Sequence, residues 1–210
     1  MKCLVKICGI TNLKDAVASI ESGADAIGFI FYKKSKRYVS PSIVADIIKN
    51  IPSNIFKVGV FVNEAASNIN TIVEQTGINI VQLHGDEKPE DCSQYKLCVW
   101  KGVRLKDETE IEQLNLFTQF SVCAFVFDSH FNGEYGGTGV LSDWDLARLA
   151  ANNHRIILAG GLTPDNIQAA VNKVQPYGVD VNSGVEASPG KKDLFKIKTF
   201  INAVRSKELC

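Results

Sequence analysis

The sequence predicts a single-domain (β/α)8 barrel, a TIM barrel, over residues 1–210. Short runs rich in Val, Ile and Phe alternate with amphipathic stretches along the whole chain, and the units repeat at a spacing of roughly 25 residues. No linker rich in Ser, Gly or Pro divides the chain. An open doubly wound sheet is the structural alternative, but such sheets usually carry a GxGxxG-type turn after the first strand, and here that place reads Cys8-Gly9-Ile10-Thr11.

The apolar runs define eight candidate strands. In chain order they are Leu4–Cys8, Ala26–Phe31, Lys57–Val62, Ile80–His84, Cys98–Val103, Ala124–Asp128, Arg155–Ala159 and Val179–Asn182. Between strands, apolar residues recur at helical spacing, most clearly over Ile167–Val174 and Leu194–Val204. Ser40-Pro41 and Thr163-Pro164 each place an N-cap residue before a proline, which predicts a helix start at both positions. The weakest helical pattern is that of Thr109–Phe117.

The amino-acid composition indicates which classes of binding partner this protein does not favour by charge alone. Apolar residues make up 45% of the chain and charged residues 22%, which is typical of a globular protein. Lys+Arg and Asp+Glu both number 23, so no net field favours nucleic acid or an anionic membrane. No apolar stretch is long enough to span a membrane. The N-terminus reads Met1-Lys2-Cys3-Leu4-Val5-Lys6, with a lysine interrupting the apolar run, so we expect a cytoplasmic protein without a signal peptide. The sequence leaves monomer and homodimer open.

The six cysteines are scattered and show no CxxC or CxxH spacing. They are Cys3, Cys8, Cys92, Cys98, Cys123 and Cys210. Neither a zinc site nor a secreted disulfide framework is expected from this spacing, and a reducing compartment predicts free thiols. One His and one Asp at strand ends do not make a metal site, so no metal and no cofactor are predicted.

Chemistry in such barrels lies at the carboxyl ends of the strands. Cys8, His84 and Asp128 stand at three of these ends and are candidates for acid–base work. Each has a plainer interpretation. A strand cysteine is often only a small buried hydrophobe, Asp128 could satisfy loop backbone N–H groups, and His84 could orient its loop instead of contacting a substrate.

Glycines gather in three loops late in the chain. Gly136-Gly137-Thr138-Gly139 follows the sixth strand, Gly160-Gly161 the seventh, and Ser183-Gly184 the eighth. Glycine lets backbone N–H groups approach an anion without a Cβ in the way. Any single pair could be a turn, but three such loops where barrel enzymes commonly bind phosphate predict a phosphate site. Candidate substrate contacts here are Gly137, Gly139, Gly160, Gly161, Ser183 and Gly184.

Strand alternation makes a sharper prediction inside the barrel. If Cys8 points inward, Lys6 does as well, and Asp180 shares a face with Asn182 on the eighth strand. The first and eighth strands are neighbours in a closed barrel, so Lys6 and Asp180 should pair. In the loop after the second strand, Arg37 could hold a substrate carboxylate with its planar guanidinium, whereas the lysines around it are expected to be solvated.

These stretches together resemble the phosphoribosylanthranilate isomerase family of tryptophan biosynthesis. The resemblance covers nearly the whole chain in order, and it is carried by Lys6-Ile7-Cys8-Gly9-Ile10-Thr11, Ser35-Lys36-Arg37-Tyr38-Val39-Ser40-Pro41, Val81-Gln82-Leu83-His84-Gly85, Tyr135-Gly136-Gly137-Thr138-Gly139, Leu158-Ala159-Gly160-Gly161-Leu162, Val179-Asp180-Val181-Asn182-Ser183-Gly184-Val185-Glu186 and further motifs. Each motif alone is weak, but the combination is specific. The segment 129–134 is less typical of the family.

The resemblance implies an Amadori rearrangement of N-(5-phosphoribosyl)anthranilate without metal or cofactor. It implies Cys8 as general base, Asp128 as general acid and Arg37 as the group that binds the substrate carboxylate. Two alternatives remain. The related barrel isomerase of histidine biosynthesis runs the same rearrangement on a substrate with two phosphates, but it uses an aspartate where Cys8 stands. A non-catalytic barrel could instead bind phosphosugars without turning them over.

Overall fold

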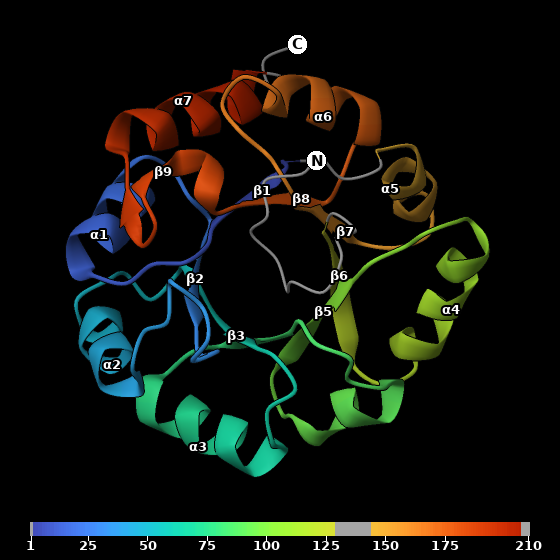
Figure 1. The fold of residues 1–210 in the computed structure, drawn as a ribbon, viewed down its shortest axis with the longest axis horizontal. Helices are drawn as coiled ribbons and strands as arrows, with labels where there is room; N and C mark the ends of the chain where they lie inside the picture. Colours follow the sequence, from blue (N-terminus) through green and yellow to red (C-terminus); the bar gives the residue numbers. More distant parts are fainter. Residues whose placement is uncertain (1, 129–143, 207–210) are drawn as a thin grey trace.

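A computed structural model describes residues 2–128 and 144–206, and its strands close into the predicted barrel (Figure 1). The eight parallel strands are hydrogen-bonded in chain order, with β8 returning to β1. They are β1 (Leu4–Ile7), β2 (Ala26–Ile30), β3 (Phe56–Phe61), β4 (Ile80–Leu83), β5 (Cys98–Val103), β6 (Val122–Phe127), β7 (Ile156–Leu158) and β8 (Gly178–Val181). Most observed strands end one residue before the predicted end, so the predicted tip residues begin the loops.

Helices form the outer ring around these strands (Figure 1). They are α1 (Leu13–Glu21), α2 (Pro41–Lys49), α3 (Ala66–Thr76), α4 (Thr109–Thr118), α5 (Trp144–Ala151), α6 (Ile167–Val174) and α7 (Leu194–Arg205), with 3₁₀ turns η1 (Pro89–Gln94) and η2 (Ser183–Val185). The Ser40 hydroxyl accepts from the backbone N–H of Ile43 at the start of α2, as predicted. The weakly patterned segment does form a helix, α4.

One predicted helix start is wrong. Helix α6 begins at Ile167 and not at Pro164, because the preceding residues form a turn closed by the Asn166 side chain. Asn166 Oδ1 accepts from the backbone N–H of Thr163, and its Nδ2 donates to the Gly161 carbonyl. The Asn166 side chain thereby fixes the shape of the loop after β7.

The hydrophobic core has two layers. Within the barrel, inward-facing apolar residues of β1 to β7 and the residue after β7 pack together. They are Leu4, Ala26, Val58, Ile80, Trp100, Ala124, Val126, Ile157 and Ala159. Ala124 and Val126 thus point inward beneath Asp128, as alternation predicted. The alternate residues, such as Ile27, Phe29 and Phe125, pack outward against the helices.

A short antiparallel hairpin follows β8 and was not predicted. Its strands are β9 (Glu186–Ser188) and β10 (Lys191–Lys192), joined through Gly190 at φ 80°. The Thr11 hydroxyl donates to the Gly190 carbonyl, and Asp15 Oδ2 accepts from the backbone N–H of Lys192. These bonds tie the hairpin to the loop after β1 and to α1.

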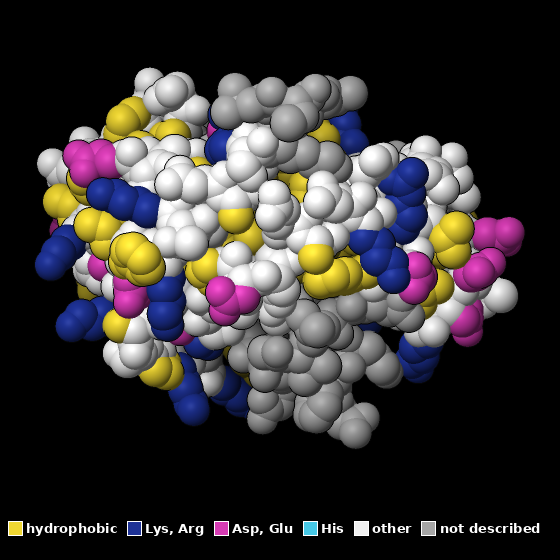
Figure 2. All heavy atoms as spheres, turned by 90° about the horizontal axis from the view of Figure 1, so that it is seen from above, with side chains coloured by type: hydrophobic (Ala, Val, Ile, Leu, Met, Phe, Trp, Pro, Cys, Tyr) yellow, Lys and Arg dark blue, Asp and Glu magenta, His cyan; other side chains and the backbone are white. Residues whose placement is uncertain are grey.

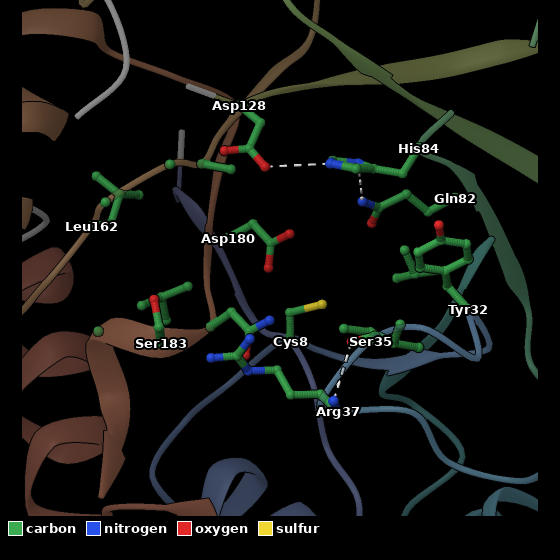
Figure 3. Close-up of a pocket in the computed structure, with 18 of the residues that line it drawn as sticks. Cys8, Tyr32, Ser35, Arg37, Gln82, His84, Asp128, Leu162, Asp180 and Ser183 are labelled. Carbon is green, nitrogen blue, oxygen red and sulfur yellow. Dashed lines mark hydrogen bonds and ion pairs between the residues drawn. The ribbon is translucent and has the colours of Figure 1, made fainter. Parts of the chain in front are cut away.

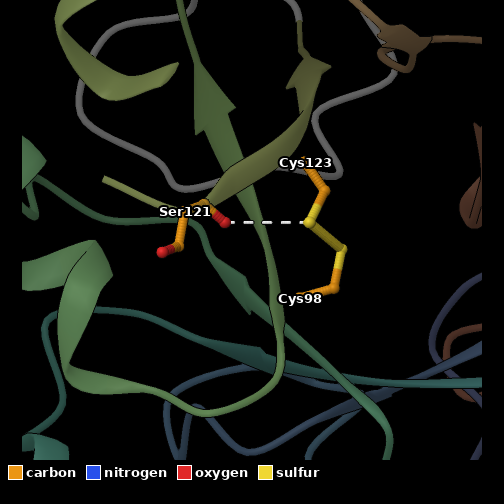
Figure 4. Close-up of a disulfide and its surroundings, with 3 residues drawn as sticks. All are labelled: Cys98, Ser121 and Cys123. Carbon is orange, nitrogen blue, oxygen red and sulfur yellow. Dashed lines mark hydrogen bonds between the residues drawn. A yellow bond between two sulfur atoms is a disulfide. The ribbon is translucent and has the colours of Figure 1, made fainter. Parts of the chain in front are cut away.

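Cys98 and Cys123 form a disulfide (Figure 4), so the prediction of free thiols is wrong for these two. Their separation of 25 residues matches no sequence motif. Consecutive strands pair in this barrel, however, so β5 and β6 are neighbours, and their register shifts between Val99 and Trp100. The two Cα atoms lie 5.9 Å apart, within the range of disulfides. Cys3, Cys8 and Cys92 are buried thiols, and Cys210 lies outside the described residues.

Acidic and basic side chains are interspersed on the face drawn in Figure 2, and neither sign forms a continuous patch there. This distribution agrees with the equal numbers of acidic and basic residues in the sequence. Within residues 2–128 and 144–206, no helix has the length and apolar character needed to cross a membrane.

Candidate active site

One pocket at the carboxyl ends of the strands collects most of the residues singled out from the sequence (Figure 3). Those that line it are Cys8, Arg37, His84, Asp128, Gly160, Gly161, Ser183 and Gly184. The remaining two candidates, Gly137 and Gly139, lie outside the described residues. These side chains lie in loops that are far apart in the sequence. They become neighbours because parallel strands present their carboxyl ends on the same face of the barrel.

Cys8 follows β1 and lies at the base of this pocket, with its side chain almost fully buried. Burial raises the pKa of the thiol above its ordinary value, and the nearby Lys6 ammonium opposes that rise only in part. Gly28 on β2 makes room for both groups, because a Cβ there would lie 2.8 Å from Cys8 Sγ and 3.0 Å from Lys6 Cε. At neutral pH the Cys8 thiol is therefore protonated.

Lys6 and Asp180 pair inside the barrel, as predicted. They are register partners on β1 and β8, and Lys6 Nζ lies 2.6 Å from Asp180 Oδ2. Burial alone would lower the pKa of Lys6, but Asp180 and Cys8 outweigh that effect and raise it, so the lysine stays charged. The second carboxylate oxygen, Asp180 Oδ1, is buried and has no hydrogen-bond partner among the described residues.

Asp128 follows β6 on the opposite side of the pocket from Cys8 (Figure 3). His84 Nε2 lies 3.3 Å from Asp128 Oδ2, and Gln82 Nε2 lies 3.1 Å from His84 Nδ1. With Gln82 donating to Nδ1, the His84 proton sits on Nε2 and faces Asp128. Gly102 leaves space for the imidazole, since a Cβ there would lie 2.4 Å from Nδ1.

Arg37 is held by an acidic residue from the hairpin. Its Nε lies 2.9 Å and 3.1 Å from the two carboxylate oxygens of Glu186, and its Nη2 lies 2.7 Å from Glu186 Oε2. Burial would raise the pKa of Glu186, but the hydrogen bond from Arg37 and the charge of Lys192 lower it below its usual range. Among the described residues, Arg37 Nη1 has no hydrogen-bond partner, which leaves that edge for a ligand.

Lys192 completes this cluster from β10. Its Nζ lies 3.1 Å from Glu186 Oε1 and 3.0 Å from Asn182 Oδ1. Burial lowers the pKa of Lys192, although the charge of Glu186 opposes this. Two cations thus surround one carboxylate, so the cluster of Arg37, Lys192 and Glu186 attracts a further anion.

The loops after β7 and β8 are shaped for close backbone approach. Gly160 and Gly161 adopt φ angles of 80° and 62°, in the left-handed region that favours glycine. Gly184 packs so tightly that an added Cβ would lie 1.9 Å from the Leu162 carbonyl oxygen. Together with Ser183, these residues line the pocket side of both loops, which suits a phosphate group.

The sequence did not single out Gln82, Glu186 or Lys192 as site residues. Gln82 could have been found by alternation, because it lies two residues before His84 on the same strand face. Glu186 and Lys192 gave no such signal. They do not line the pocket, but the hairpin brings them against Arg37 and Asn182, which do. The three- and two-residue strands of the hairpin are too short for a periodic pattern.

Comparisons with known proteins agree on one family. The sequence profile described as N-(5'-phosphoribosyl)anthranilate (PRA) isomerase matches residues 5–203. The chain is 50% identical over 201 residues to the N-(5'-phosphoribosyl)anthranilate isomerase of Pelobacter propionicus, covering 96% of this chain and 95% of that relative.

Solved structures give the same result. The phosphoribosyl anthranilate isomerase of Thermotoga maritima superposes with a TM-score of 0.89 at 42% identity, over 97% of this chain and 99% of that one. A phosphoribosyl anthranilate isomerase in complex with reduced 1-(o-carboxyphenylamino)-1-deoxyribulose 5-phosphate is 42% identical, with a TM-score of 0.86 and the same coverage.

Proposed function

Because this chain belongs to the N-(5'-phosphoribosyl)anthranilate isomerase family, we propose that Cys8 is its general base and Asp128 its general acid. The chain is an aldose–ketose isomerase of tryptophan biosynthesis. It converts N-(5-phosphoribosyl)anthranilate to 1-(2-carboxyphenylamino)-1-deoxyribulose 5-phosphate. The conversion moves hydrogen from C2 to C1 of the sugar and needs no external oxidant or reductant.

Ring opening is assigned to Asp128. The protonated carboxyl gives its proton to the furanose ring oxygen as the bond from C1 to that oxygen breaks, and the lone pair of the anilino nitrogen forms the C1=N double bond. The product of this step is a cationic iminium. The Nε2–H of His84, which faces Asp128, is suited to hold the carboxylate that remains.

Deprotonation is assigned to Cys8. The iminium acidifies the proton on C2, and the thiolate removes it to give an enolamine that tautomerises to the ketone. A cationic substrate intermediate also favours the thiolate over the thiol. Lys6 and Lys192, whose charges lower the pKa of Cys8 against the larger effect of burial, assist this ionisation.

Arg37 and the glycine loops place the substrate. The Nη1 edge of Arg37 would bind the anthranilate carboxylate, supported by the positive cluster to which it belongs. The loops with Gly160, Gly161, Ser183 and Gly184 would bind the phosphate. A small phosphorylated molecule with a carboxylate at its other end therefore fits the pocket.

The observation that carries the proposal is the placement of Cys8 and Asp128 on opposite sides of one pocket (Figure 3). One acid and one base facing the same space are what the two proton transfers require. A glycosylamine held between them presents its ring oxygen to one residue and its C2 proton to the other.

The test is the loss of fluorescence of freshly prepared phosphoribosylanthranilate with wild type, Cys8→Ala and Asp128→Asn. We expect turnover by wild type and a fall in kcat of ~100-fold or more in each variant, the usual loss on removing an acid or a base. Cys92→Ala is the matched control, because Cys92 is another free, buried cysteine that does not line the pocket, and its kcat should stay at the wild-type level.

Two results would count against the proposal. A folded wild type that binds phosphate but leaves this substrate unchanged would reject the activity and turn attention to the two-phosphate substrate of histidine biosynthesis. If wild type, Cys8→Ala and Asp128→Asn all turn over the substrate at similar rates, the activity is supported but the assigned roles are rejected.

A further inference from the structure

Asp180 occupies the centre of the pocket, between Cys8 and Asp128 (Figure 3). Asp180 is 8% exposed, and only one of its carboxylate oxygens has a partner among the described residues, through the 2.6 Å contact with Lys6. The other oxygen, Oδ1, has no partner there. A buried carboxylate oxygen without a donor is costly and calls for one, and a ligand in the pocket would supply it.

The position of this oxygen is fixed by the fold. Lys6 is fully buried and is the register partner of Asp180 across β1 and β8, so the carboxylate cannot turn away without breaking that ion pair. Lys6 also places a positive charge 2.6 Å from the other oxygen of this carboxylate. The pocket thus holds a negatively charged acceptor in a set orientation.

The other acidic groups in and beside the pocket already face described partners. Glu186 is bound by Arg37 and Lys192, and Asp128 faces His84. The other buried acceptor without a partner among the described residues, Gln82 Oε1, carries no charge. A cation that forms in this space therefore meets Asp180 as its available counter-ion.

We propose that Asp180 is a further catalytic residue, whose Oδ1 accepts a hydrogen bond from the anilino N–H and stabilises the iminium cation. This inference rests on the proposed function above. As the ring opens, the proton of Asp128 goes to the ring oxygen, the C1–O bond breaks and the C1=N bond forms, while Asp180 stays ionised throughout. Its hydrogen bond strengthens as the nitrogen becomes positive, so the effect is larger on the intermediate than on the substrate.

Asp180→Asn tests this, because it removes the charge at nearly constant shape. In single-turnover reactions we expect the rate to fall by ~100-fold, as for loss of one electrostatic contact to a developing charge, with substrate affinity within ~3-fold. Adducts of 5-methyl-, unsubstituted and 5-chloroanthranilate give the specific readout. The rate of Asp180→Asn should fall more steeply with electron withdrawal than that of wild type, since the cation has lost its counter-ion.

A second comparison distinguishes a catalytic role of Asp180 from a purely structural one. Asp180→Asn leaves the buried Lys6 ammonium unpaired, which destabilises the barrel. The double variant Lys6→Met/Asp180→Asn removes both charges, and Lys6→Met is its reference. We expect the double variant to remain below Lys6→Met, by a smaller factor than separates Asp180→Asn from wild type because Lys6→Met also loses the ion pair that orients Asp180, and to keep the steeper substituent dependence.

Three outcomes would overturn the inference. The first is a wild-type rate in Asp180→Asn. The second is a loss of substrate affinity alone, with an unchanged dependence on the substituent, which would indicate a contact to a sugar hydroxyl. The third is recovery of the double variant to the rate of Lys6→Met. Wild type and Cys8→Ala are measured alongside. An inactive wild type would reject the proposed function itself, whereas an active wild type with an unaffected Asp180→Asn rejects this inference alone.

Discussion

At the scale of single residues, the pocket is ordered before a substrate arrives. Arg37 is already held on one edge by Glu186, and Glu186 is held in turn by Lys192 and by the backbone N–H of Gly190. Fixing a guanidinium in this way reduces the rotamer entropy lost on binding. Glu186 also removes part of the positive charge, so the position of Arg37 and the charge around it are set by the same residue.

Glu186→Gln should therefore weaken binding of the substrate carboxylate more than it slows the reaction. The amide cannot accept the paired hydrogen bonds from Arg37, and the guanidinium becomes free to move. We expect KM for phosphoribosylanthranilate to rise by ~10-fold, equal to loss of about 1.4 kcal/mol of binding, with kcat within ~3-fold. Glu21→Gln, on the exposed end of α1, is the control and should leave KM unchanged. A fall in kcat at constant KM would contradict this view.

At the scale of elements, regular strands were predictable and irregular connections were not. Period-two alternation placed Ala124, Val126 and the Lys6–Asp180 pair correctly, because every barrel strand obeys it. The hairpin carrying Glu186 and the turn before α6 depend on contacts with distant residues, such as the bond from the Lys192 backbone to Asp15. No local pattern encodes such contacts.

The contact between the loops after β7 and β8 is tested by Gly184→Ala. The added Cβ would lie 1.9 Å from the Leu162 carbonyl oxygen, so the two loops must separate. We expect the inhibition constant of inorganic phosphate and the KM to rise by ~10-fold or more, since a misplacement of about 1 Å costs a binding site much of its effect. Gly77→Ala is the control, because that glycine ends α3 at φ 77° and lies outside the pocket. It should lower stability without changing phosphate inhibition, and equal effects of the two variants would refute the prediction.

At the scale of the whole molecule, the sequence was sufficient for the fold class because eight similar units have few ways to bury their apolar faces. The prediction that residues 1–210 form one domain concerns the entire chain and stays a prediction. Closure depends on joining the first and last elements. Asp25, between α1 and β2, accepts hydrogen bonds from the Val5 backbone, from Lys2 and from Arg205 at the end of α7.

Asp25→Asn should destabilise the protein in a pH-dependent way. Burial would raise the pKa of Asp25, but hydrogen bonds from Lys2, Val5 and Arg205 outweigh it and lower the pKa. A carboxyl whose pKa is lower in the folded state stabilises the fold fully above its unfolded value, ~3.9, and this contribution is lost as the pH falls through the folded value. Urea unfolding should show wild type more stable than Asp25→Asn by about 1–2 kcal/mol at pH 7, a figure reduced for partial exposure, and the gap should narrow below pH ~4.

The control for this pH effect is Asp46→Asn, since the Asp46 side chain is 79% exposed and lies 3.8 Å from Lys49. An exposed pair of that kind contributes little, so this variant should match wild type within ~0.5 kcal/mol at every pH. The difference in unfolding free energy between wild type and Asp25→Asn could instead stay constant down to pH ~3. That result would show that the charge of the Asp25 carboxylate does not stabilise the contact between the two ends of the chain. The hydrogen-bonding shape of the side chain, which asparagine shares in part, would then account for the closure.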